Sequence, residues 1–392
     1  MPKLIQNLQD LIALPSISSS NPALDVSNRP VIDLLAERLA DLGFAIEIQT
    51  VTDSCVNGAN TTAAKYNLIA TLGSGSGGLV LAGHTDTVPY DDGKWQSDPF
   101  TLTDRDNRFY GLGTTDMKGF FAVALEAIES FCETLGDTSK LKQPLIVIAT
   151  ADEETSMSGA KALVAADTQQ ARYAVIGEPT GLKPVRMHKG VMMESISLEG
   201  RSGHSSNPAL GNSALDAMHK VIAELMALRE DWGKKYQNPA FEVILPTLNL
   251  ASIHGGDAPN RICRHCELRF DVRLLPGMQN DDVRRSIKNR VAASLEGSHI
   301  TAKHSSLFDG VSAFLEPETS ELVQFAEKLT GHSAISAGFA TEAPYLQALG
   351  MQTIVMGPGS IDCAHQANEY LAQDQITPGI DLLKSLIQQY CL

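Results

Sequence analysis

The sequence lacks the features of a membrane or secreted protein. No apolar run approaches the roughly 20 residues that a membrane-spanning helix needs. The first residues, MPKLIQNLQDLIALP, are amphipathic and carry an acid, without the apolar core or cleavage site of a signal peptide. The 6 cysteines have no regular spacing, which argues against a disulfide framework. We therefore expect a soluble, reduced, cytoplasmic protein without a membrane partner.

Positive charge is also scarce. The chain has 31 Lys and Arg residues against 46 Asp and Glu residues, a net charge of −15, and no basic cluster reverses this balance. A chain with this charge is not attracted to the negatively charged phosphates of a nucleic acid. The stretch from Gly73 to Gly78 lacks the GKS or GKT ending of a phosphate-binding loop, and no G-x-G-x-x-G follows a predicted strand. We expect neither a nucleic-acid partner nor a nucleotide-binding fold.

The length and the order of the predicted elements indicate two domains. A chain of 392 residues is long for one domain. Apolar runs typical of buried strands alternate with amphipathic helix patterns over residues 1–185 and again over residues 310–392. This alternation predicts an α/β domain with a mostly parallel sheet flanked by helices. Residues 186–309 follow the order β-α-β-β-α-β, which predicts an inserted ferredoxin-like α+β domain.

Carboxylates follow two of the predicted buried strands. The acids Asp152 to Glu154 come after the apolar run from Leu145 to Ala149, and Glu178 follows the run from Tyr173 to Ile176. Because ligands of an open α/β sheet bind at the carboxyl ends of its strands, this pattern suggests a metal site. The alternative is a polar loop and a helix start, where acids are also favoured. On these residues alone, both interpretations stay open.

Two histidines and two further acids occupy comparable positions. His84 and Asp86 follow a short apolar run two residues apart, so an extended chain would place them on one side. Asp116 immediately precedes a predicted amphipathic helix, and His365 comes shortly after the last predicted strand. A metal-binding histidine commonly donates its second ring N–H to a carboxylate, which Asp86 would provide. The alternatives are a hydrogen-bonded loop pair for His84 and Asp86, and a helix N-cap for Asp116.

These candidates form a donor set of imidazoles and carboxylates without thiolates. Such a set suits zinc, cobalt or manganese. Two histidines and three or more carboxylates are enough to hold two metal ions with one acid between them, and such a pair can activate a water and polarise a carbonyl. One acid is then left as the general base, a division that the adjacent Glu153 and Glu154 fit.

Six motifs, in order and spacing, resemble the dinuclear zinc aminoacylase/carboxypeptidase family. They are GHTDTVP, GLGTTDMKG, ADEETS, GEPT, GRSGHSS and the late AHQ, and the similarity covers nearly the whole chain. The resemblance implies a zinc-exopeptidase-like catalytic domain and an inserted lid and dimerisation domain. It also implies direct hydrolysis of an amide by a water that two metal ions activate.

The resemblance assigns roles to individual residues of the catalytic domain. His84, Asp116 and Glu178 would hold one metal ion, and Asp116, Glu154 and His365 would hold the other, with zinc the expected metal and cobalt an alternative. Glu153 would be the general base that takes a proton from the attacking water and returns it to the leaving amine. Asp86 would orient His84.

Further positions match substrate-binding segments of the family. His204, in the inserted domain, would reach the active site of the partner subunit in a homodimer and stabilise the developing oxyanion. Asn260 and Arg273 would grip a substrate carboxylate. Gly359 belongs to the loop Gly357 to Ser360, which would line the pocket.

Five segments indicate the substrate within the family, namely MHKG, GRSGHSSNP, GDAPNRIC, ATEAPY and GPGSI. They resemble most the members that hydrolyse N2-acetyl-L-ornithine to acetate and L-ornithine in arginine biosynthesis. The alternative substrates are N-succinyl-diaminopimelate or a broader range of N-acyl amino acids and dipeptides. We also infer that Glu342 helps to recognise the cationic side chain of the substrate, although an acid at a helix start is the alternative for this residue.

Overall fold

The computed structural model describes residues 2–52, 55–56, 59–60, 63–166 and 171–392. The chain forms two compact units. The first comprises residues 1–186, 316–335 and 341–392, and the second comprises residues 187–315 and 336–340. The second unit therefore extends past the predicted end of the insert at residue 309 and also takes in a five-residue segment from further along the chain.

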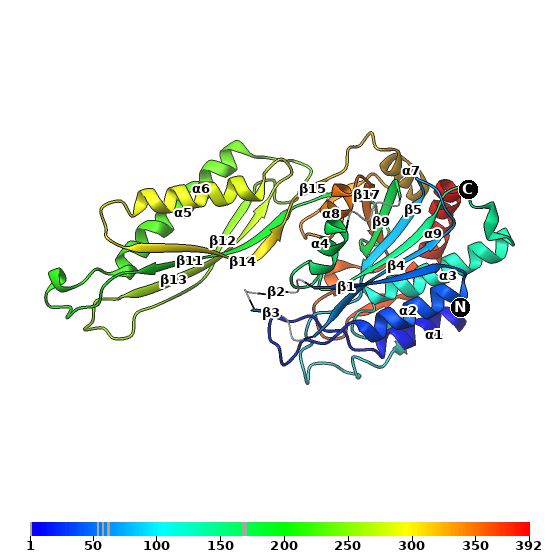
Figure 1. Ribbon diagram of the computed structural model, residues 1–392, viewed down its shortest axis with the longest axis horizontal. Coiled ribbons are helices and arrows are strands. Elements are labelled where there is room, and N and C mark those ends of the chain that lie inside the picture. Colours follow the sequence, from blue (N-terminus) through cyan, green and yellow to red (C-terminus); the bar gives the residue numbers. More distant parts are fainter. Residues whose placement is uncertain (1, 53–54, 57–58, 61–62, 167–170) are drawn as a thin grey trace. The chain divides into compact units, whose positions relative to one another are not determined.

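The first unit is built around a mixed sheet whose central strands are parallel. Its order is β1-β4-β8-β5-β9-β17-β10, with bounds Ala45–Val51, Lys65–Leu72, Leu145–Thr150, Leu79–His84, Tyr173–Pro179, Gln352–Gly357 and Val185–His188 (Figure 1). The strands β8, β5, β9 and β17 run parallel to one another. β1, β4 and β10 are antiparallel to their neighbours. The predicted α/β class is confirmed.

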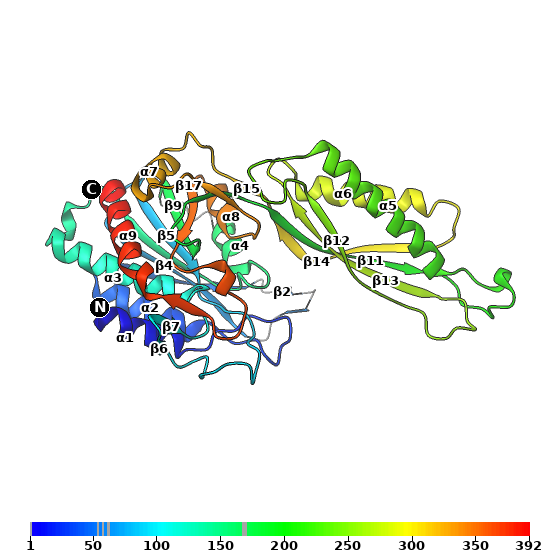
Figure 2. The ribbon, with the colours of Figure 1, turned by 180° about the vertical axis from the view of Figure 1, so that it is seen from behind.

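Helices cover both faces of this sheet. One face packs against α2 (Arg29–Asp41), α3 (Lys118–Leu135), α7 (Glu321–Thr330) and α9 (Ile376–Cys391), and α1 (Pro2–Ile12) packs on α3. The other face packs against α4 (Ser158–Ala165) and α8 (Ala343–Ala348). Figure 2 shows α3 and α9 side by side. Because both faces are covered, every residue of β5 and β8 is buried. No helix in the described part of the chain is long and apolar enough to cross a membrane.

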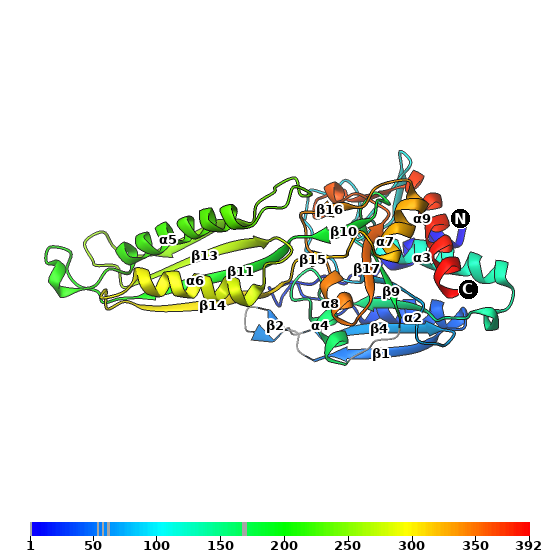
Figure 3. The same cartoon turned by 90° about the horizontal axis from the view of Figure 1, so that it is seen from above.

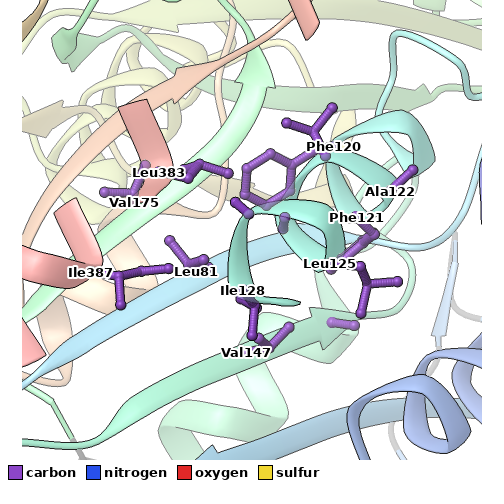
Figure 4. Close-up of a cluster of buried hydrophobic side chains, with 14 of the residues drawn as sticks. Leu81, Phe120, Phe121, Ala122, Leu125, Ile128, Val147, Val175, Leu383 and Ile387 are labelled. Atoms are coloured by element: carbon purple, nitrogen blue, oxygen red, sulfur yellow. The ribbon is translucent and has the colours of Figure 1, made fainter. Parts of the chain in front are cut away.

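Helix α3 supplies the centre of the core. Its buried apolar side chains belong to one core cluster with side chains of the sheet and of α9; Figure 4 labels Phe120, Phe121, Leu125, Ile128, Leu81, Val147, Val175, Leu383 and Ile387 in this cluster. Full burial of one such side chain stabilises the fold by about 1.5–3 kcal/mol. Gly177 in β9 permits the approach, since a Cβ there would lie 2.1 Å from the Phe120 ring. This packing fixes the start of α3 and the loop before it, which carries Asp116.

A small three-stranded sheet joins the C-terminal segment to that same loop. It consists of β6 (Thr103–Arg105), β7 (Arg108–Tyr110) and β18 (Tyr370–Ala372), in the order β18-β7-β6. Tyr370 lies opposite Tyr110 in the antiparallel pair β18 and β7. These strands were not predicted, because a run of three residues is too short to carry a periodic pattern. The remaining short strands are β2 (Cys55–Val56), β3 (Ala59–Asn60), β15 (Phe314–Leu315) and β16 (Ile335–Ala337).

The second unit is a four-stranded antiparallel sheet with two helices. Its chain order is β11 (Gly190–Glu199), α5 (Ala214–Lys235), β12 (Thr247–Gly255), β13 (His265–Leu274), α6 (Asn280–Ser294) and β14 (Thr301–Val311), and its strand order is β12-β13-β11-β14. Figure 3 shows α5 and α6 lying over the strands. The predicted ferredoxin-like α+β fold is confirmed. β14 extends through polar residues such as Ser306, which pairs with Glu194 of β11.

Candidate metal centre

Side chains from five separate segments meet at the carboxyl ends of the parallel strands. His84 is the last residue of β5, and Glu178 lies near the end of the neighbouring β9. Both residues therefore belong to strands rather than to the loops that follow them. Glu154 lies in the turn after β8, Asp116 lies two residues before α3, and His365 follows β17. The structure brings these five sequence-predicted ligands together.

The Asp116 carboxylate lies between the two histidines. Its Oδ1 is 3.0 Å from Nε2 of His84, and its Oδ2 is 3.2 Å from Nε2 of His365. A second carboxylate lies beside each ring: Glu178 Oε1 is 3.7 Å from the His84 nitrogen, and Glu154 Oε1 is 3.0 Å from the His365 nitrogen. This arrangement forms two overlapping donor groups that share Asp116.

These contacts perturb both histidines. Burial by itself would lower the pKa of His84, but the hydrogen bond to Asp116 and the charge of Glu178 raise it well above its usual value. Hydrogen bonds to Asp116 and Glu154 raise the pKa of His365 to about 10. Without another cation, these contacts favour the protonated form of both rings, whose positive charge offsets part of the negative charge of the acids.

The acids of the centre repel one another. Burial raises the pKa of Glu153 well above its usual value, and the charges of Glu178 and Glu154 raise it further. Burial, followed by the charge of Asp116, does the same to the pKa of Glu178. Crowded buried carboxylates bind protons or cations tightly, because either one removes the repulsion.

The donor set fits divalent metal ions. Among the described residues, ligand atoms of His84, Asp116 and Glu154 all lie within 4.8 Å of one another. The available donors are imidazole nitrogens and carboxylate oxygens without sulfur, as expected for zinc or cobalt. The Nδ1 of His84 donates to the main-chain carbonyl of Asp86 at 3.0 Å, which leaves Nε2 as the nitrogen that faces the carboxylates.

Asp86 supports both sides of the centre. Its Oδ1 accepts a hydrogen bond from the main-chain N–H of Glu153 at 3.2 Å, and its Oδ2 accepts one from Glu154 at 3.1 Å. The same carboxylate lies 3.6 Å from Nδ1 of His84. Asp86 therefore holds the turn that carries the two glutamates and also contacts the ring of His84.

Lys65 is a buried support that the sequence analysis missed. Its ammonium lies 2.8 Å from Asp25 and 3.1 Å from Asp152, and it also donates to Ser18 Oγ at 3.3 Å. Asp152 directly precedes Glu153, so its ion pair with Lys65 also holds the turn that carries Glu153 and Glu154. The sequence offers only a weak signal, a lysine at the start of a largely apolar strand, because the acidic partners of Lys65 are remote along the chain.

Glu342 and Gly359 lie close to the centre. Glu342 is buried, and its Oε1 has no hydrogen-bond partner among the described residues. Burial raises the pKa of Glu342 to about 7, and its charge acts on Glu153 and Glu178. Gly359 has a φ of +95°, and a Cβ there would lie 3.0 Å from Thr115 Cγ2. The loop that contains Gly359 therefore packs against the segment that carries Asp116.

The other predicted substrate residues belong to the second unit. His204 is exposed, its Nδ1 lies 2.8 Å from Ser206 Oγ, and it forms a β-bridge with Arg261. The carbonyl of Asn260 accepts a hydrogen bond from Ser205 at 3.1 Å, so His204 and Asn260 lie on neighbouring segments. Arg273 lies on β13 and pairs with Asp271 at 3.2 Å. The roles of these three residues stay predictions.

Comparison with known proteins relates the chain to metal-dependent hydrolases. Residues 80–389 match the sequence profile described as peptidase family M20/M25/M40. The chain is 47% identical to a protein named acetylornithine deacetylase from Klebsiella pneumoniae (strain 342) and 46% identical to one of the same name from Edwardsiella ictaluri (strain 93-146). Each match covers 100% of this chain and 98% of the relative.

Solved structures share the fold at low identity. An M20 family metallo-carboxypeptidase from Sulfolobus solfataricus matches with a TM-score of 0.75 at 17% identity, covering 99% of both chains. A tripeptidase from Staphylococcus aureus matches with a TM-score of 0.74 at 18% identity, covering 99% of this chain and 98% of the other. These likenesses extend over both units.

The pKa shifts determine how the stability of the metal-free chain changes with pH. The raised pKa values of Glu342 (about 7) and Glu369 (about 8) mean that the folded chain binds these protons more tightly than the unfolded chain. Their contribution to stability is present at acid pH and is lost as the pH rises through those values. The contribution of His365 is lost in the same direction, between about 6.5, its ordinary pKa, and about 10.

We expect zinc to stabilise the chain more at alkaline than at acid pH, because the metal replaces protons that hold the acids together. Thermal unfolding of chelator-treated protein, with and without added zinc, should show a gain of about 5 °C or more near pH 8 and a much smaller gain near pH 5.5. The Asp116→Asn variant lacks the shared carboxylate and serves as the control without a gain. An equal gain at both pH values would contradict the expectation.

Proposed function

Because the chain belongs to peptidase family M20/M25/M40, we propose that it hydrolyses the amide bond of N2-acetyl-L-ornithine and releases acetate and L-ornithine. The observation that carries this proposal is the 47% identity, over the whole chain, to a protein named acetylornithine deacetylase. The assembled donor set of His84, Asp116 and Glu154 supports the hydrolytic chemistry. Desuccinylation of N-succinyl-diaminopimelate and broader N-acyl-amino-acid hydrolysis are the alternatives that the assay below separates.

We propose two divalent metal ions, zinc by preference and cobalt as an alternative. His84 and Glu178 would hold one ion, His365 and Glu154 would hold the other, and Asp116 would contact both. The support is geometric, since each oxygen of Asp116 faces a different histidine. When bound, the ions would polarise the amide carbonyl and lower the pKa of the attacking water.

Glu153 is the proposed general base. Among the described residues its carboxylate forms no ion pair with a histidine, unlike those of Asp116, Glu154 and Glu178, while its main-chain N–H donates to Asp86. Its raised pKa matches the need for a group that accepts a proton from water and then donates it to the departing amine. Asp86 keeps Glu153 in place through the turn and does not itself exchange the proton.

The second unit would contribute to catalysis from another subunit. We propose a homodimer in which His204 of one subunit donates a hydrogen bond to the developing oxyanion in the active site of its partner. Asn260 and Arg273 would bind the substrate carboxylate through an amide and a guanidinium. Their support is the family resemblance together with the exposure of His204, which leaves its ring accessible.

Glu342 is the proposed recognition site for the substrate ammonium. It occupies the N-cap position of α8, but its side chain makes no capping hydrogen bond, so a capping role does not account for the acid. Its Oε1 is buried without a hydrogen-bond partner among the described residues, and its charge lies beside those of Glu153 and Glu178. A cation brought to this position would relieve the repulsion, whereas the carboxylate tail of a succinyl substrate would increase it.

We expect metal-stripped protein to regain activity with zinc or cobalt, most strongly on N2-acetyl-L-ornithine. The assay compares that substrate with N-succinyl-L,L-diaminopimelate and N-acetyl-L-methionine. The Glu153→Gln variant should bind zinc normally and lose about 10²–10⁴-fold in kcat. Restored activity greatest on another of the three amides would keep the chemistry and reject the substrate. Absence of metal-dependent hydrolysis of all three would reject the proposed function.

We expect the Glu342→Gln variant to change specificity rather than general activity. Loss of the negative charge should lower kcat/KM for N2-acetyl-L-ornithine by about tenfold or more, while N-acetyl-L-methionine, which has a neutral side chain, should change by less than about twofold. Glu316→Gln is the matched control, since Glu316 is another buried acid of the first unit. Equal losses on both substrates would contradict the assignment.

We expect inactive chains to complement one another if His204 acts across the dimer. A mixture of the His204→Ala and Glu153→Gln variants forms mixed dimers with one complete active site each. Random pairing of equal amounts should restore about a quarter of the wild-type activity. A mixture as inactive as its two components would place His204 outside the partner's active site.

A further inference from the structure

Glu369 is a buried acid of the first unit with no role in the chemistry described above. It lies four residues after His365, immediately before β18, and is 2% exposed. Its Oε1 accepts hydrogen bonds from the main-chain N–H groups of Thr115 at 2.7 Å and Asp116 at 3.0 Å. Glu369 therefore contacts the backbone of the residue whose carboxylate lies between the two histidines.

The partners of this carboxyl group are mainly backbone donors. Burial raises the pKa of Glu369 to about 8, the N–H of Asp116 opposes that shift, and the negative charge of Asp116 adds to it. Lys118 is buried nearby, but its ammonium donates to the carbonyls of Leu11 and Leu14, each at 3.0 Å. Burial of a carboxyl group costs free energy unless hydrogen bonds compensate for the lost hydration. The hydrogen bonds from the backbone of Thr115 and Asp116 provide this compensation for Glu369.

The backbone around Asp116 needs to be held. Gly113 has a φ of +85°, and the chain turns sharply between it and the start of α3. The loop is irregular, so its N–H groups have no partners from a helix or a sheet ladder, and Glu369 supplies the acceptor for two of them.

The segment around Glu369 grips the loop at further points. The main-chain carbonyl of Glu369 accepts a hydrogen bond from Gly111 at 3.1 Å, and the next residue, Tyr370, pairs with Tyr110 between β18 and β7. The hydroxyl of Thr115 donates to the Tyr370 carbonyl. The same segment presents His365 to the other side of Asp116, at 3.2 Å from Oδ2. One stretch of chain thus contacts the Asp116 backbone and its carboxylate.

We propose that Glu369 is a positioning residue of the metal centre: its Oε1 fixes the backbone of Thr115 and Asp116 and so aims the Asp116 carboxylate between His84 and His365. The inference rests on the metal site of the proposed function and not on the identity of the substrate. It assigns the effect to hydrogen-bond acceptance at one oxygen. A glutamine amide has an oxygen at the same place, so Glu369→Gln should keep the effect and Glu369→Leu should lose it.

The test measures zinc affinity of the full chain, without substrate, by competition with a chromophoric chelator. Glu369→Leu should weaken zinc binding by about 10–100-fold, as removal of outer-shell support commonly does, and Glu369→Gln should stay within about threefold of wild type. Glu369→Asp should also weaken zinc binding, because its shorter side chain places the carboxylate oxygen too far from the N–H groups of Thr115 and Asp116. This variant provides the test if the leucine variant does not fold. With N2-acetyl-L-ornithine, kcat should fall with the zinc affinity.

Glu316→Leu is the matched control for loss of a buried acid. Glu316 is 4% exposed, and it accepts a backbone hydrogen bond from Thr353 at 3.1 Å. This variant should lower the melting temperature while leaving the zinc affinity unchanged, which separates general destabilisation from an effect on the metal centre.

Three results would overturn the proposal. The first is an unchanged zinc affinity in both Glu369→Leu and Glu369→Asp. The second is a Glu369→Gln variant that binds zinc as weakly as Glu369→Leu does. The third is a Glu316→Leu variant that loses as much zinc affinity as Glu369→Leu. The second result would assign the effect to the charge of Glu369. Wild-type protein that binds zinc but does not hydrolyse N2-acetyl-L-ornithine would reject the proposed substrate and leave this test intact.

Discussion

Repulsion among buried carboxylates is the constraint on which the rest of the first unit depends. Two like charges about 4 Å apart repel by about 4 kcal/mol at an effective dielectric constant near 20. Glu153, Glu154 and Glu178 lie near Asp116 in a buried site, and burial together with the neighbouring negative charges raises the pKa values of the three glutamates. To keep these carboxylates together, the structure must hold the backbone of each acidic residue in place and must supply protons or cations. The supports beneath the centre follow from this requirement.

Residues on strands and residues on loops of the centre are held in place in different ways. Parallel pairing of β5 and β9, with Ala82 opposite Ile176, brings together the strand ends that carry His84 and Glu178. Loop residues need dedicated acceptors instead. Asp86 receives the N–H groups of Glu153 and Glu154. The apolar core also helps to position Asp116, because the packing of α3 on the sheet fixes the end of the loop that carries this residue.

The sequence pattern predicted the acids of the centre and one of their supports, Asp86, but not the other supports. Strand ends can be read from short apolar runs, so the acids that follow them could be predicted, together with the α/β class and the order of elements in the inserted domain. Lys65 and Glu369 could not be found in this way. Each contacts residues remote in the chain, Lys65 at Asp152 and Glu369 at Asp116, and only the folded topology makes such pairs neighbours. The short strands β6, β7 and β18, which bring Glu369 to its place, carry no periodic signal either.

The balance of charge at the centre bears on the choice of substrate. The carboxylates that surround it carry more negative charge, when ionised, than two divalent cations would offset; they are Asp116, Glu153, Glu154, Glu178, Glu342 and Glu369. The histidines would be neutral as ligands and would contribute no charge. Glu342 is one of these acids, and its Oε1 has no hydrogen-bond partner in the described part of the chain. If Glu342 recognises the substrate as proposed, an ammonium group brought there would complete the neutralisation, whereas a second carboxylate would add to the excess. The charge that makes the site suitable for metals would then also favour a cationic amino acid over an acidic one.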